Sequence, residues 1–562
     1  MRLGRDMRAT LLGLLVLGAC SSGGSDASYG GNGGASVSDA GVAGCLTSNE
    51  CPTGYTCSDF GVCMPPAPMG DGGVTPPAET ELTLAAPITA QRFVYVAMTD
   101  ENELARIDGS SLAVIATHVG NQPRDVAAIP HSDGAVVLDA TNGTATVVRP
   151  NSDGTDTVKV LATLQHLNRI DIDPSGRFAV IWFDLVKAVA NGGLTGIGSF
   201  QDVTVVALAP GAEKAVNLTV GFRPREVQFD APGDRAYVIT QDGVSVIDLG
   251  YATAHEATII PPIAVADPAV SPDDLEVNIV STGEYAAVRQ TNASDLRVVA
   301  VGHTNPGQAW TIPLASPATD IDLAPDGSRV YAVERAAQKI AVVDIPGDAV
   351  DPAGVETIDV ADASVGSLQL SADGTRGLMF TNATLDPRIT RIAFDQPGYP
   401  HVTFPLKKSV RAVLMSPTSA SAIVVNAKEP GDPATATTVD EYIARSYGYT
   451  VLDVASGFGK LQLTPVDPGA LAYSHDGTKA YVTLDGGDAL TATRALNVIT
   501  IQTGVVITKE LGSPPSTVGV LPAVPSAFVA QRHPLGRISF LDLGTDAVRT
   551  VTGFDLNSHV VN

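Results

Sequence analysis

The stretch Ile-Asp-Leu-Ala-Pro-Asp-Gly-Ser-Arg-Val-Tyr-Ala-Val at residues 321–333 carries the pattern that decides the fold. Two short apolar runs, Ile321–Leu323 and Val330–Val333, stand on either side of the turn sequence Pro325-Asp326-Gly327. Runs rich in Val, Ile and Tyr favour β-strands, and glycine supplies the positive φ of a tight turn between them. The stretch therefore predicts a β-hairpin.

The same hairpin pattern recurs along the chain. Turns of this kind also occur at Asp173-Pro174-Ser175-Gly176, Ala372-Asp373-Gly374 and His475-Asp476-Gly477. A third apolar run then ends in an aspartate, at Val246–Asp248, Val342–Asp344, Val451–Asp453 and Phe540–Asp542. With a weaker fourth strand in each unit, the period is about 45 to 50 residues, which lies in the range of four-stranded propeller blades.

The second strand of each unit is apolar on both of its faces, as in Ala236–Ile239 and Val330–Val333. A sandwich strand with one wet face alternates between apolar and polar residues, whereas a blade stacked between two neighbours buries both faces. We therefore expect residues 85–562 to form an all-β fold, a β-propeller of four-stranded blades.

The repeat count is about ten, whereas common propellers have about four to eight blades. We expect one large ring, with two rings or a merged pair of units as the alternatives. The first unit lacks an obvious innermost strand, and we expect Asn557–Val561 to supply one and so to close the ring. The units begin near residues 93, 123, 167, 224, 275, 318, 365, 410, 468 and 515.

The repeats resemble the YVTN (lactonase-like) β-propeller family. The resemblance rests on Tyr95-Val96, Tyr237-Val238, Tyr331-Ala332 and Tyr481-Val482-Thr483, together with the strands that end in Val-Ile-Asp. It covers nearly the whole repeat region and implies the propeller fold. It also implies an alternative activity, hydrolysis of sugar lactones at the funnel, but no catalytic residue of that family can be matched by position. WD dipeptides are absent, and Trp182 and Trp310 are too few for the docking repeats of quinoprotein dehydrogenases.

The first residues have the order of a signal peptide. Arg2, Arg5 and Arg8 form a basic start, and residues 9–19 are an apolar or small-residue run that is too short to span a bilayer. The run ends in Leu17-Gly18-Ala19-Cys20, which resembles the lipobox of bacterial lipoproteins. That resemblance implies removal of residues 1–19 and a diacylglyceryl anchor on Cys20. An ordinary secretory leader with an accidental cysteine is the alternative. We expect a lipid-anchored protein of the cell envelope, at the outer membrane of a Gram-negative-type bacterium.

Three short segments separate the leader from the propeller. Residues 20–44 are rich in Gly, Ser, Ala and Asp and are expected to be a disordered tether. Residues 45–63 hold four evenly spaced cysteines, which predict two disulfides in an oxidising compartment, with the connectivity left open. Residues 64–84 are rich in proline and are expected to be a stiffer linker. The cysteines are Cys45, Cys51, Cys57 and Cys63.

The cysteine-rich segment resembles small EGF-like or Dickkopf-N-terminal-like modules through Cys51-Pro52-Thr53-Gly54-Tyr55-Thr56-Cys57 and Gly61-Val62-Cys63. A zinc site is the alternative to the disulfides, but CxxC spacing and a neighbouring histidine are absent. We expect this module to act as a spacer, with ligand binding as the alternative role.

The composition excludes some functions. The 562 residues include 44% hydrophobic and 17% charged residues, and the formal net charge is −25, so a globular, acidic protein is expected. The acidic balance repels phosphate backbones, and nucleic-acid binding is not expected. The nine histidines are scattered, and GxSxG, phosphate-binding and calcium-loop patterns are missing. We therefore predict no metal and no cofactor, and we assign no catalytic residue.

Three arginines are the candidate binding residues. Arg124, Arg225 and Arg411 occupy equivalent places, two residues before the first apolar residue of the leading strand of their units, a position that borders the central funnel of a propeller. Three guanidinium groups there could bind a carboxylate or phosphate. Local pairing with Asp125 and Glu226 is the alternative.

Two longer loops and two pairs of acids complete the candidate features. The loops, residues 184–201 and 428–448, are expected on one face of the ring, where loops often carry binding function. The paired acids, Asp171/Asp173 and Asp320/Asp322, are expected to cap turns and to face solvent. The sequence thus favours a binding or scaffold protein for an envelope protein, a glycan or a small anion, with a lactonase-like hydrolase as the alternative.

Replacing Cys20 by alanine tests the lipid anchor. Because the cysteine thiol takes the lipid, we expect Cys20→Ala to abolish incorporation of a labelled fatty acid and to release the protein from the membrane fraction. Metabolic lipid labelling followed by membrane fractionation measures both effects. A product that stays lipid-labelled and membrane-bound contradicts the expectation.

Overall fold

A computed structural model shows the architecture of the chain. It describes the short strands β1 (Thr56–Cys57) and β2 (Cys63–Met64), which pair with each other, and most of residues 89–553. Within that range, residues 100, 140, 191–198, 256–257, 488–491 and 534–535 are excepted. Cys20, Cys45 and Cys51 lie outside the described residues, so the lipid anchor and the disulfides stay predictions.

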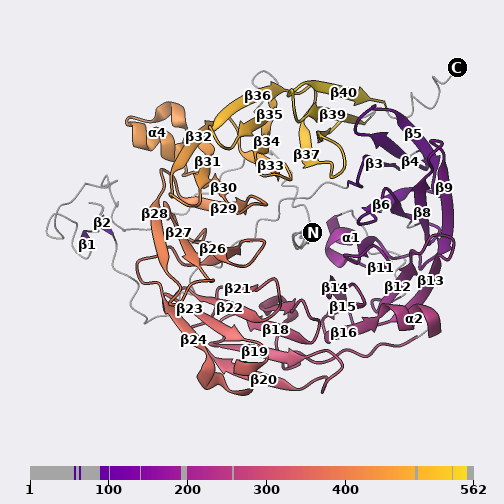
Figure 1. Ribbon diagram of the computed structural model, residues 1–562, viewed down its shortest axis with the longest axis horizontal. Coiled ribbons are helices and arrows are strands. Elements are labelled where there is room, and N and C mark those ends of the chain that lie inside the picture. Colours follow the sequence, from indigo (N-terminus) through magenta and orange to yellow (C-terminus); the bar gives the residue numbers. More distant parts are fainter. Residues whose placement is uncertain are drawn as a thin grey trace, which may run out of the picture. The chain divides into compact units, whose positions relative to one another are not determined.

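Ten small antiparallel sheets follow one another along the chain and form the blades of one closed ring (Figure 1). In eight of them, four strands pair in sequence order, and the blade starts agree with the predicted positions to within two residues. The prediction of one large ring of about ten blades is thus confirmed. Among the described residues, blades 1 and 4 have three strands each.

The first five blades comprise these strands: β3 (Phe93–Met98), β4 (Glu103–Asp108) and β5 (Val114–His118) in blade 1; β6 (Pro123–Ala128), β7 (Ala135–Asp139), β8 (Thr144–Pro150) and β9 (Asp156–Ala162) in blade 2; β10 (Arg169–Ile172), β11 (Phe178–Trp182), β12 (Asp202–Ala207) and β13 (Lys214–Thr219) in blade 3; β14 (Pro224–Phe229), β15 (Arg235–Thr240) and β16 (Gly243–Asp248) in blade 4; β17 (Leu275–Ile279), β18 (Tyr285–Gln290), β19 (Asp295–Ala300) and β20 (Ala309–Pro313) in blade 5.

The other five blades comprise these strands: β21 (Asp320–Leu323), β22 (Arg329–Glu334), β23 (Lys339–Asp344) and β24 (Glu356–Asp359) in blade 6; β25 (Ser367–Leu370), β26 (Arg376–Phe380), β27 (Arg388–Ala393) and β28 (His401–Pro405) in blade 7; β29 (Val410–Met415), β30 (Ser421–Asn426), β31 (Tyr447–Asp453) and β32 (Gly459–Thr464) in blade 8; β33 (Pro468–Tyr473), β34 (Lys479–Gly486), β35 (Thr493–Thr500) and β36 (Val505–Glu510) in blade 9; β37 (Pro515–Val520), β38 (Ser526–Gln531), β39 (Arg537–Asp542) and β40 (Val548–Thr552) in blade 10.

The short helical segments lie between strands. They are α1 (Leu185–Ala190), α2 (Leu249–His255), α3 (Gly347–Val350), α4 (Val439–Arg445), η2 (Pro272–Asp274), η3 (Pro352–Gly354) and η4 (Pro433–Thr435). Within the described part of the chain, no helix has the length and apolar character needed to cross a membrane.

The predicted hairpin turns are present. Ile321 lies opposite Ala332 in the ladder between β21 and β22, and Gly327 has a φ of 74°, in the left-handed region that favours glycine. Asp326 Oδ1 accepts a hydrogen bond from Ser328 N at 2.9 Å and so fixes the turn. Turns with the same glycine geometry close the hairpins at Gly176, Gly374 and Gly477.

The aspartates that end the third strands cap the turns that follow. Asp453 Oδ1, at the end of β31, accepts hydrogen bonds from Ser456 N and Ser456 Oγ, at 2.7 and 2.6 Å. Asp542 Oδ1 accepts one from Thr545 N at 2.8 Å in the same way. The recurring Val-Ile-Asp strand end therefore encodes a turn as well as a strand.

The core lies between blades. Ten clusters of buried apolar side chains are present, one at each of the ten contacts between neighbouring blades. Tyr237, at 0% exposure in β15, packs in the cluster between blades 4 and 5, whereas Ala236 and Val238 pack in the cluster between blades 3 and 4. The expectation that the second strands bury both faces is confirmed.

The ring closes where blade 10 meets blade 1. Phe528 and Phe540 of blade 10 pack with Val94 and Ile107 of blade 1 in one buried cluster. The predicted closing strand, Asn557–Val561, lies outside the described residues. Among those residues, blade 10 has four strands of its own, and Thr89 forms a single bridge to Val94 at the inner edge of blade 1.

Blade 4 replaces its fourth strand by a different segment. After α2 the chain returns along β16, where Ile263 and Val244 exchange two backbone hydrogen bonds, at 2.8 and 2.9 Å. Ile259 of the same segment bridges Thr219 of blade 3. The segment therefore links the outer parts of two blades.

Two glycine substitutions distinguish the loss of stability caused by a positive φ from the further loss caused by a steric clash with the neighbouring blade. At Gly327 a Cβ would lie 2.5 Å from Ser281 Oγ of blade 5, whereas at Gly154, whose φ is 91°, it would meet open space. We expect Gly154→Ala to lower the free energy of unfolding by about 1 kcal/mol, and Gly327→Ala by roughly 2 to 3 kcal/mol. Denaturant unfolding measures the difference, and equal losses would contradict contact between the two hairpins.

Candidate functional site

The inner strands of five blades begin with the same irregularity. In β6, β14, β29, β33 and β37 the pairing with the second strand shifts directly after the first residue, as in a β-bulge. In three of these strands the shifted position is an arginine, namely Arg124, Arg225 and Arg411. Bulges re-aim side chains, and the three arginines share this backbone position in their blades.

The contacts of the arginines differ. Arg225 Nη2 lies 2.8 Å from Asp273 Oδ1 in the connection to blade 5, and Arg124 Nη2 donates to Gln122 Oε1 at 3.3 Å. Arg411 forms an ion pair with a residue of blade 9, described below with its pocket. The anion site shared by the three arginines stays a prediction.

The acid next to Arg124 has other partners. Asp125 Oδ1 accepts from Lys187 Nζ of α1 at 2.7 Å, and its Oδ2 accepts from Ile170 N of β10 at 2.9 Å. Asp125 therefore links blade 2 both to α1 and to the inner strand of blade 3.

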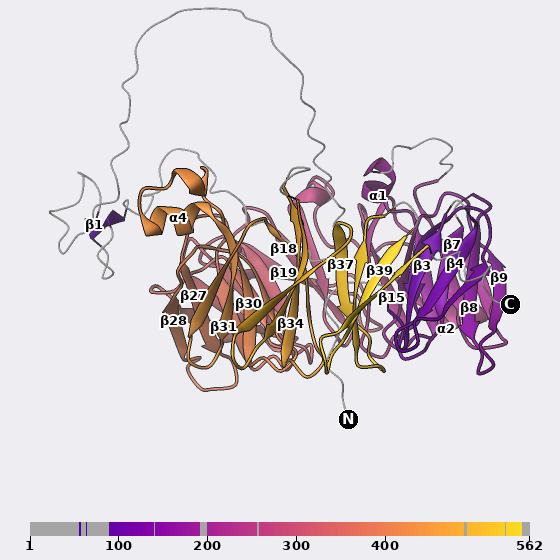
Figure 2. The same cartoon turned by 90° about the horizontal axis from the view of Figure 1, so that it is seen from above.

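Two inserted helices stand on one face of the ring. The loops that join the second and third strands of blades 3 and 8 contain α1 and α4, and Figure 2 shows both helices projecting from the same side. The prediction that residues 184–201 and 428–448 emerge on one face is confirmed for their described parts. We call this side the insert face, and the opposite side, which carries the hairpin turns such as Pro325–Gly327, the hairpin face.

Helix α4 is fixed at both ends. At its start, Thr438 Oγ1 accepts a hydrogen bond from Glu441 N at 3.1 Å, which forms an N-cap. At its end, Lys408 Nζ donates to Ile443 O and Ala444 O, at 2.6 and 2.8 Å. Lys408 is 4% exposed, and burial lowers its pKa to about 8. A buried amine in the connection between blades 7 and 8 thus holds the carbonyl end of the helix.

The side chains of α4 do not contribute to the core. None of its residues is buried, and Val439 and Tyr442, one helical turn apart, are 74% and 48% exposed. On α1, Val186 and Val189 have the same spacing and are 61% and 59% exposed. Each insert therefore presents an apolar pair to solvent, although both inserts are anchored to the ring.

A cavity of about 500 Å³ opens beside the start of β29. It is lined by residues of three blades, and its polar side chains are Asn382 of blade 7, Arg411, Lys428, Glu429 and Tyr447 of blade 8, and Asp467 of blade 9. The cavity lies on the insert face, because the inner strands start there. Such a volume is in the range of small-ligand sites.

The charged groups of this cavity are held in place. Arg411 Nη1 and Nη2 donate to the two carboxylate oxygens of Asp467, at 2.7 and 2.6 Å, in a bidentate ion pair. Lys428 Nζ donates to Gly431 O at 2.9 Å and lies 5.3 Å from the centre of the Tyr447 ring. The pocket therefore has a preformed lining.

A smaller cavity of about 220 Å³ is lined by Arg235, Asp248, Ile263 and His303, among others. Arg235 Nη1 donates to Glu284 Oε1 at 3.2 Å. This smaller cavity lies among the turns of the hairpin face.

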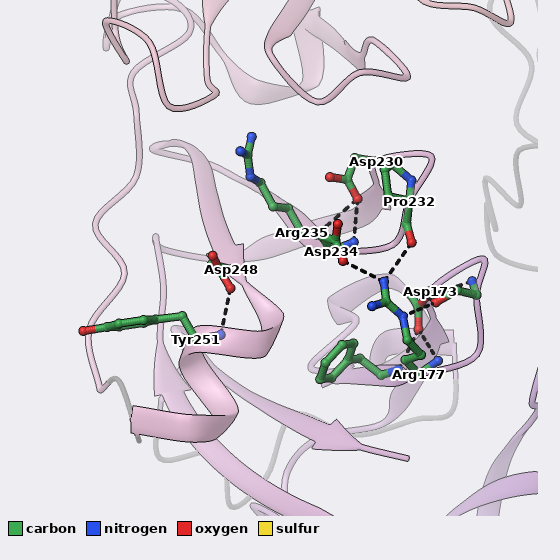
Figure 3. Close-up of polar contacts among 10 residues, drawn as sticks. Asp173, Arg177, Asp230, Pro232, Asp234, Arg235, Asp248 and Tyr251 are labelled. Atoms are coloured by element: carbon green, nitrogen blue, oxygen red, sulfur yellow. Dashed lines mark hydrogen bonds and ion pairs between the residues drawn. The ribbon is translucent and has the colours of Figure 1, made fainter. Parts of the chain in front are cut away.

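Figure 3 shows how those turns are tied together. Arg177 of blade 3 donates to Pro232 O and to Asp234 Oδ1 of blade 4, at 2.9 and 2.7 Å (Figure 3). Within blade 3, Asp173 accepts hydrogen bonds from Arg177 N and Phe178 N, at 2.7 and 2.6 Å. These contacts join the hairpin of blade 3 to that of blade 4. The polar residues of these turns therefore have a structural role.

The expected solvent exposure of the paired acids is wrong for Asp173, which is 0% exposed, although its turn-capping role is confirmed. The partners Asp171 and Asp320 have another role. Asp171 Oδ2 accepts from Trp182 Nε1 at 2.6 Å, and Asp320 Oδ2 accepts from Leu368 N of blade 7 at 2.8 Å. Inner strands have a free edge whose N–H groups need acceptors, and Asp320 supplies one to the inner strand of blade 7, whereas Asp171 holds an indole N–H within its own blade.

Burial raises the pKa of Asp171, and burial together with the nearby Asp322 carboxylate raises the pKa of Asp320 well above its ordinary value. No three His, Cys, Asp or Glu side chains of the described residues are grouped to hold a metal ion.

Comparison with known families gives one match. A family model described as the lipoprotein LpqB beta-propeller domain matches residues 260–456, from the segment before β17 in blade 5 to the turn after β31 in blade 8. The chain is similar to that family over less than half of its length. No curated protein matches the chain.

Several solved structures resemble the chain at low identity. An initiation factor of eukaryotes has 12% identity and a TM-score of 0.45 over 73% of this chain and 96% of that one. The dihydro-heme d1 dehydrogenase NirN in complex with DHE has 13% identity and a TM-score of 0.41 over 74% and 72%. Apo AztD from Citrobacter koseri has 13% identity and a TM-score of 0.37 over 68% and 96%. We draw no function from them.

The sequence indicates part of the insert face. It singles out Arg411 and the 428–448 loop, but it gives no signal for Lys408, which holds α4, or for Asp467 of the cavity, whose partners lie 35 and 56 residues away in the sequence. The helix itself had a visible signal, because Thr438 is followed three residues later by Glu441, as in a capping box.

Replacing Asp320 by asparagine tests the cost of its burial. A carboxyl whose pKa is raised on folding stabilises the protein fully below its unfolded-state pKa, and that contribution is lost as pH rises through the folded-state pKa. Asparagine keeps an acceptor for Leu368 N and carries no charge. We therefore expect Asp320→Asn to raise the melting temperature relative to the parent more at pH 7 than at pH 4.

Asp326→Asn is the matched control, since hydrogen bonds from Ser328 lower the pKa of Asp326. That substitution should lower the melting temperature more at pH 7 than at pH 4. Thermal unfolding of both variants across this pH range measures the two trends. Trends of the same sign would contradict the roles assigned to the two carboxyls.

Proposed function

We propose that the chain is an exported, lipid-anchored protein of the cell envelope that acts by binding, and that its insert face is the surface that binds. The ligand classes considered are an envelope protein, a glycan or a small anion. The lipobox at Cys20 and the similarity of blades 5 to 8 to a lipoprotein β-propeller domain support the location. We place the anchor at the outer membrane.

The observation that supports the proposal most strongly is that α4 is fixed at both ends and yet exposes apolar side chains. A core element exposes its polar side and buries its apolar side, but α4 buries none of its residues and exposes Val439 and Tyr442. The buried amine of Lys408 and the cap at Thr438 nevertheless hold it rigidly. Fixing an exposed apolar helix lowers the entropy lost when a partner binds, which favours a recognition element over a stabilising one.

The segments before the ring fit this role. We propose that residues 20–44 act as a flexible tether, that residues 45–63 form a disulfide-stapled module and that residues 64–84 act as a stiffer linker. Together they would give a rigid ring freedom to meet partners at a distance from the lipid. The lactonase-like hydrolase stays a prediction from resemblance, since no residue of the described site favours it specifically.

Site-specific photo-crosslinking tests the binding face. We expect a photoreactive residue at Val439 on the insert face to form covalent products in intact cells. The same residue at Phe458, in a turn on the hairpin face, should form none. The two positions are 74% and 70% exposed, so they are matched in accessibility. Electrophoretic shifts measure the products. Products of equal yield at both positions, or none at Val439, contradict the proposal.

A further inference from the structure

The cavity beside β29 is a second feature of the insert face, and its lining selects a class of ligand. The inference that follows rests on the proposed binding function. Four ionisable side chains with a full charge line the cavity, Arg411 and Lys428 against Glu429 and Asp467, and their formal charges cancel. This balance stands out in a protein whose formal net charge is −25.

The balance disfavours ligands of either sign. A small anion that approached Arg411 would have to replace Asp467, which already makes two hydrogen bonds to the guanidinium group. It would also meet the carboxylate of Glu429. A cation that approached Glu429 would meet the ammonium of Lys428, which already lies over the ring of Tyr447. Charge complementarity therefore favours a ligand without net charge.

The groups of the cavity that remain available are both donors and acceptors. Among the described residues, no hydrogen bond is made by the carboxylate of half-buried Glu429, which interacts with the charge of Lys408, or by the hydroxyl of Tyr447. Arg411 has five N–H donors, of which Asp467 occupies two, and its Nε is buried without a partner and closed to a ligand. The outer N–H groups of Nη1 and Nη2 are left for a ligand.

A hydroxyl group matches this set, because it donates one hydrogen bond and accepts others. Two adjacent hydroxyls can donate to a carboxylate such as that of Asp467 and accept from the guanidinium group beside it, without breaking the ion pair. A ligand with several hydroxyls can reach Glu429 and Tyr447 at the same time. A cavity of about 500 Å³ has room for such a molecule.

We propose that this cavity binds a neutral, hydroxyl-rich ligand, the chemical class of an uncharged sugar unit in a glycan. Arg411 and Asp467 form the paired donor and acceptor, and Glu429 and Tyr447 supply the further hydrogen bonds. The rigid lining gives specificity because a ligand that lacks a hydroxyl leaves one of these groups desolvated and unpaired.

Calorimetric titration of the full chain tests the proposal. The protein is purified in a detergent without a sugar head group, and the probes are the uncharged trisaccharides chitotriose, cellotriose and maltotriose. We expect at least one of them to bind. Tyr447→Phe and Glu429→Gln should each weaken that binding about tenfold, since each removes one hydrogen bond or one charged acceptor. Tyr251→Phe and Glu510→Gln are matched controls outside the cavity and should leave the affinity unchanged.

A charge variant tests the balance of the lining. Asp467→Asn leaves the cavity with a net positive charge and frees Arg411, so we expect this variant to bind sulfate, which the parent protein should not bind. Dialanine, a zwitterion, should bind to neither. Saturation-transfer NMR confirms that any bound sugar contacts the protein directly.

The proposal is overturned if none of the three sugars binds, if Tyr447→Phe and Glu429→Gln leave sugar binding unchanged, or if the parent protein binds sulfate or dialanine more tightly than any sugar. Unchanged melting temperatures of the variants show that they fold. If no sugar binds but crosslinking at Val439 still occurs, the sugar ligand is contradicted and the proposed binding function stands. Absence of crosslinking at Val439 removes the proposed binding function as well.

Discussion

Each described blade of the ring packs apolar side chains against both of its neighbours, and the rest of the architecture depends on that constraint. A sheet of this kind must be covered twice, and a row of such sheets leaves its first and last members half uncovered. Burying one large apolar side chain contributes about 1.5 to 3 kcal/mol, so two uncovered faces would cost far more than the net stability of a domain. Closure into a ring removes both ends. The cluster of Phe528 and Phe540 with Val94 and Ile107 is the contact that completes it.

Closure creates a second requirement at the centre. The inner strand of each blade has one edge without a strand neighbour, and its N–H and C=O groups still need partners. Side chains of the preceding blade meet several of them. Asp125 and Asp320 accept from the inner strands of the next blades, and Gln228 both donates to Val277 O, at 3.1 Å, and accepts from Ile279 N, at 2.8 Å. The acids near the funnel are therefore part of the framework, and burial raises the pKa of two of them as a consequence.

The fold was readable from the sequence because its signals are local. Each hairpin turn, each third strand ending in aspartate and the two-faced apolar pattern lie within a few residues, as in 321–333, and they recur with one period. The site was readable only in part. Arg411 was visible by its repeated position, but its partner Asp467 and the amine of Lys408 act across distances that blade curvature sets. The same limit explains why the sequence favours a turn role for Asp320, since its partner Leu368 belongs to the next blade.

The seam between blades 10 and 1 has a mechanical consequence. Among the described residues, it is held by side-chain packing and by a few hydrogen bonds, such as Arg549 Nη2 to Ser110 O and Ala523 N to Gln91 O, both 2.8 Å. Thr89, the first described residue of the ring, bridges Val94, whose side chain belongs to the seam cluster. A pulling force applied from the N-terminal side would therefore load the seam first and peel its contacts one after another. The hairpins of the other blades would bear that force as shear, across several hydrogen bonds at once.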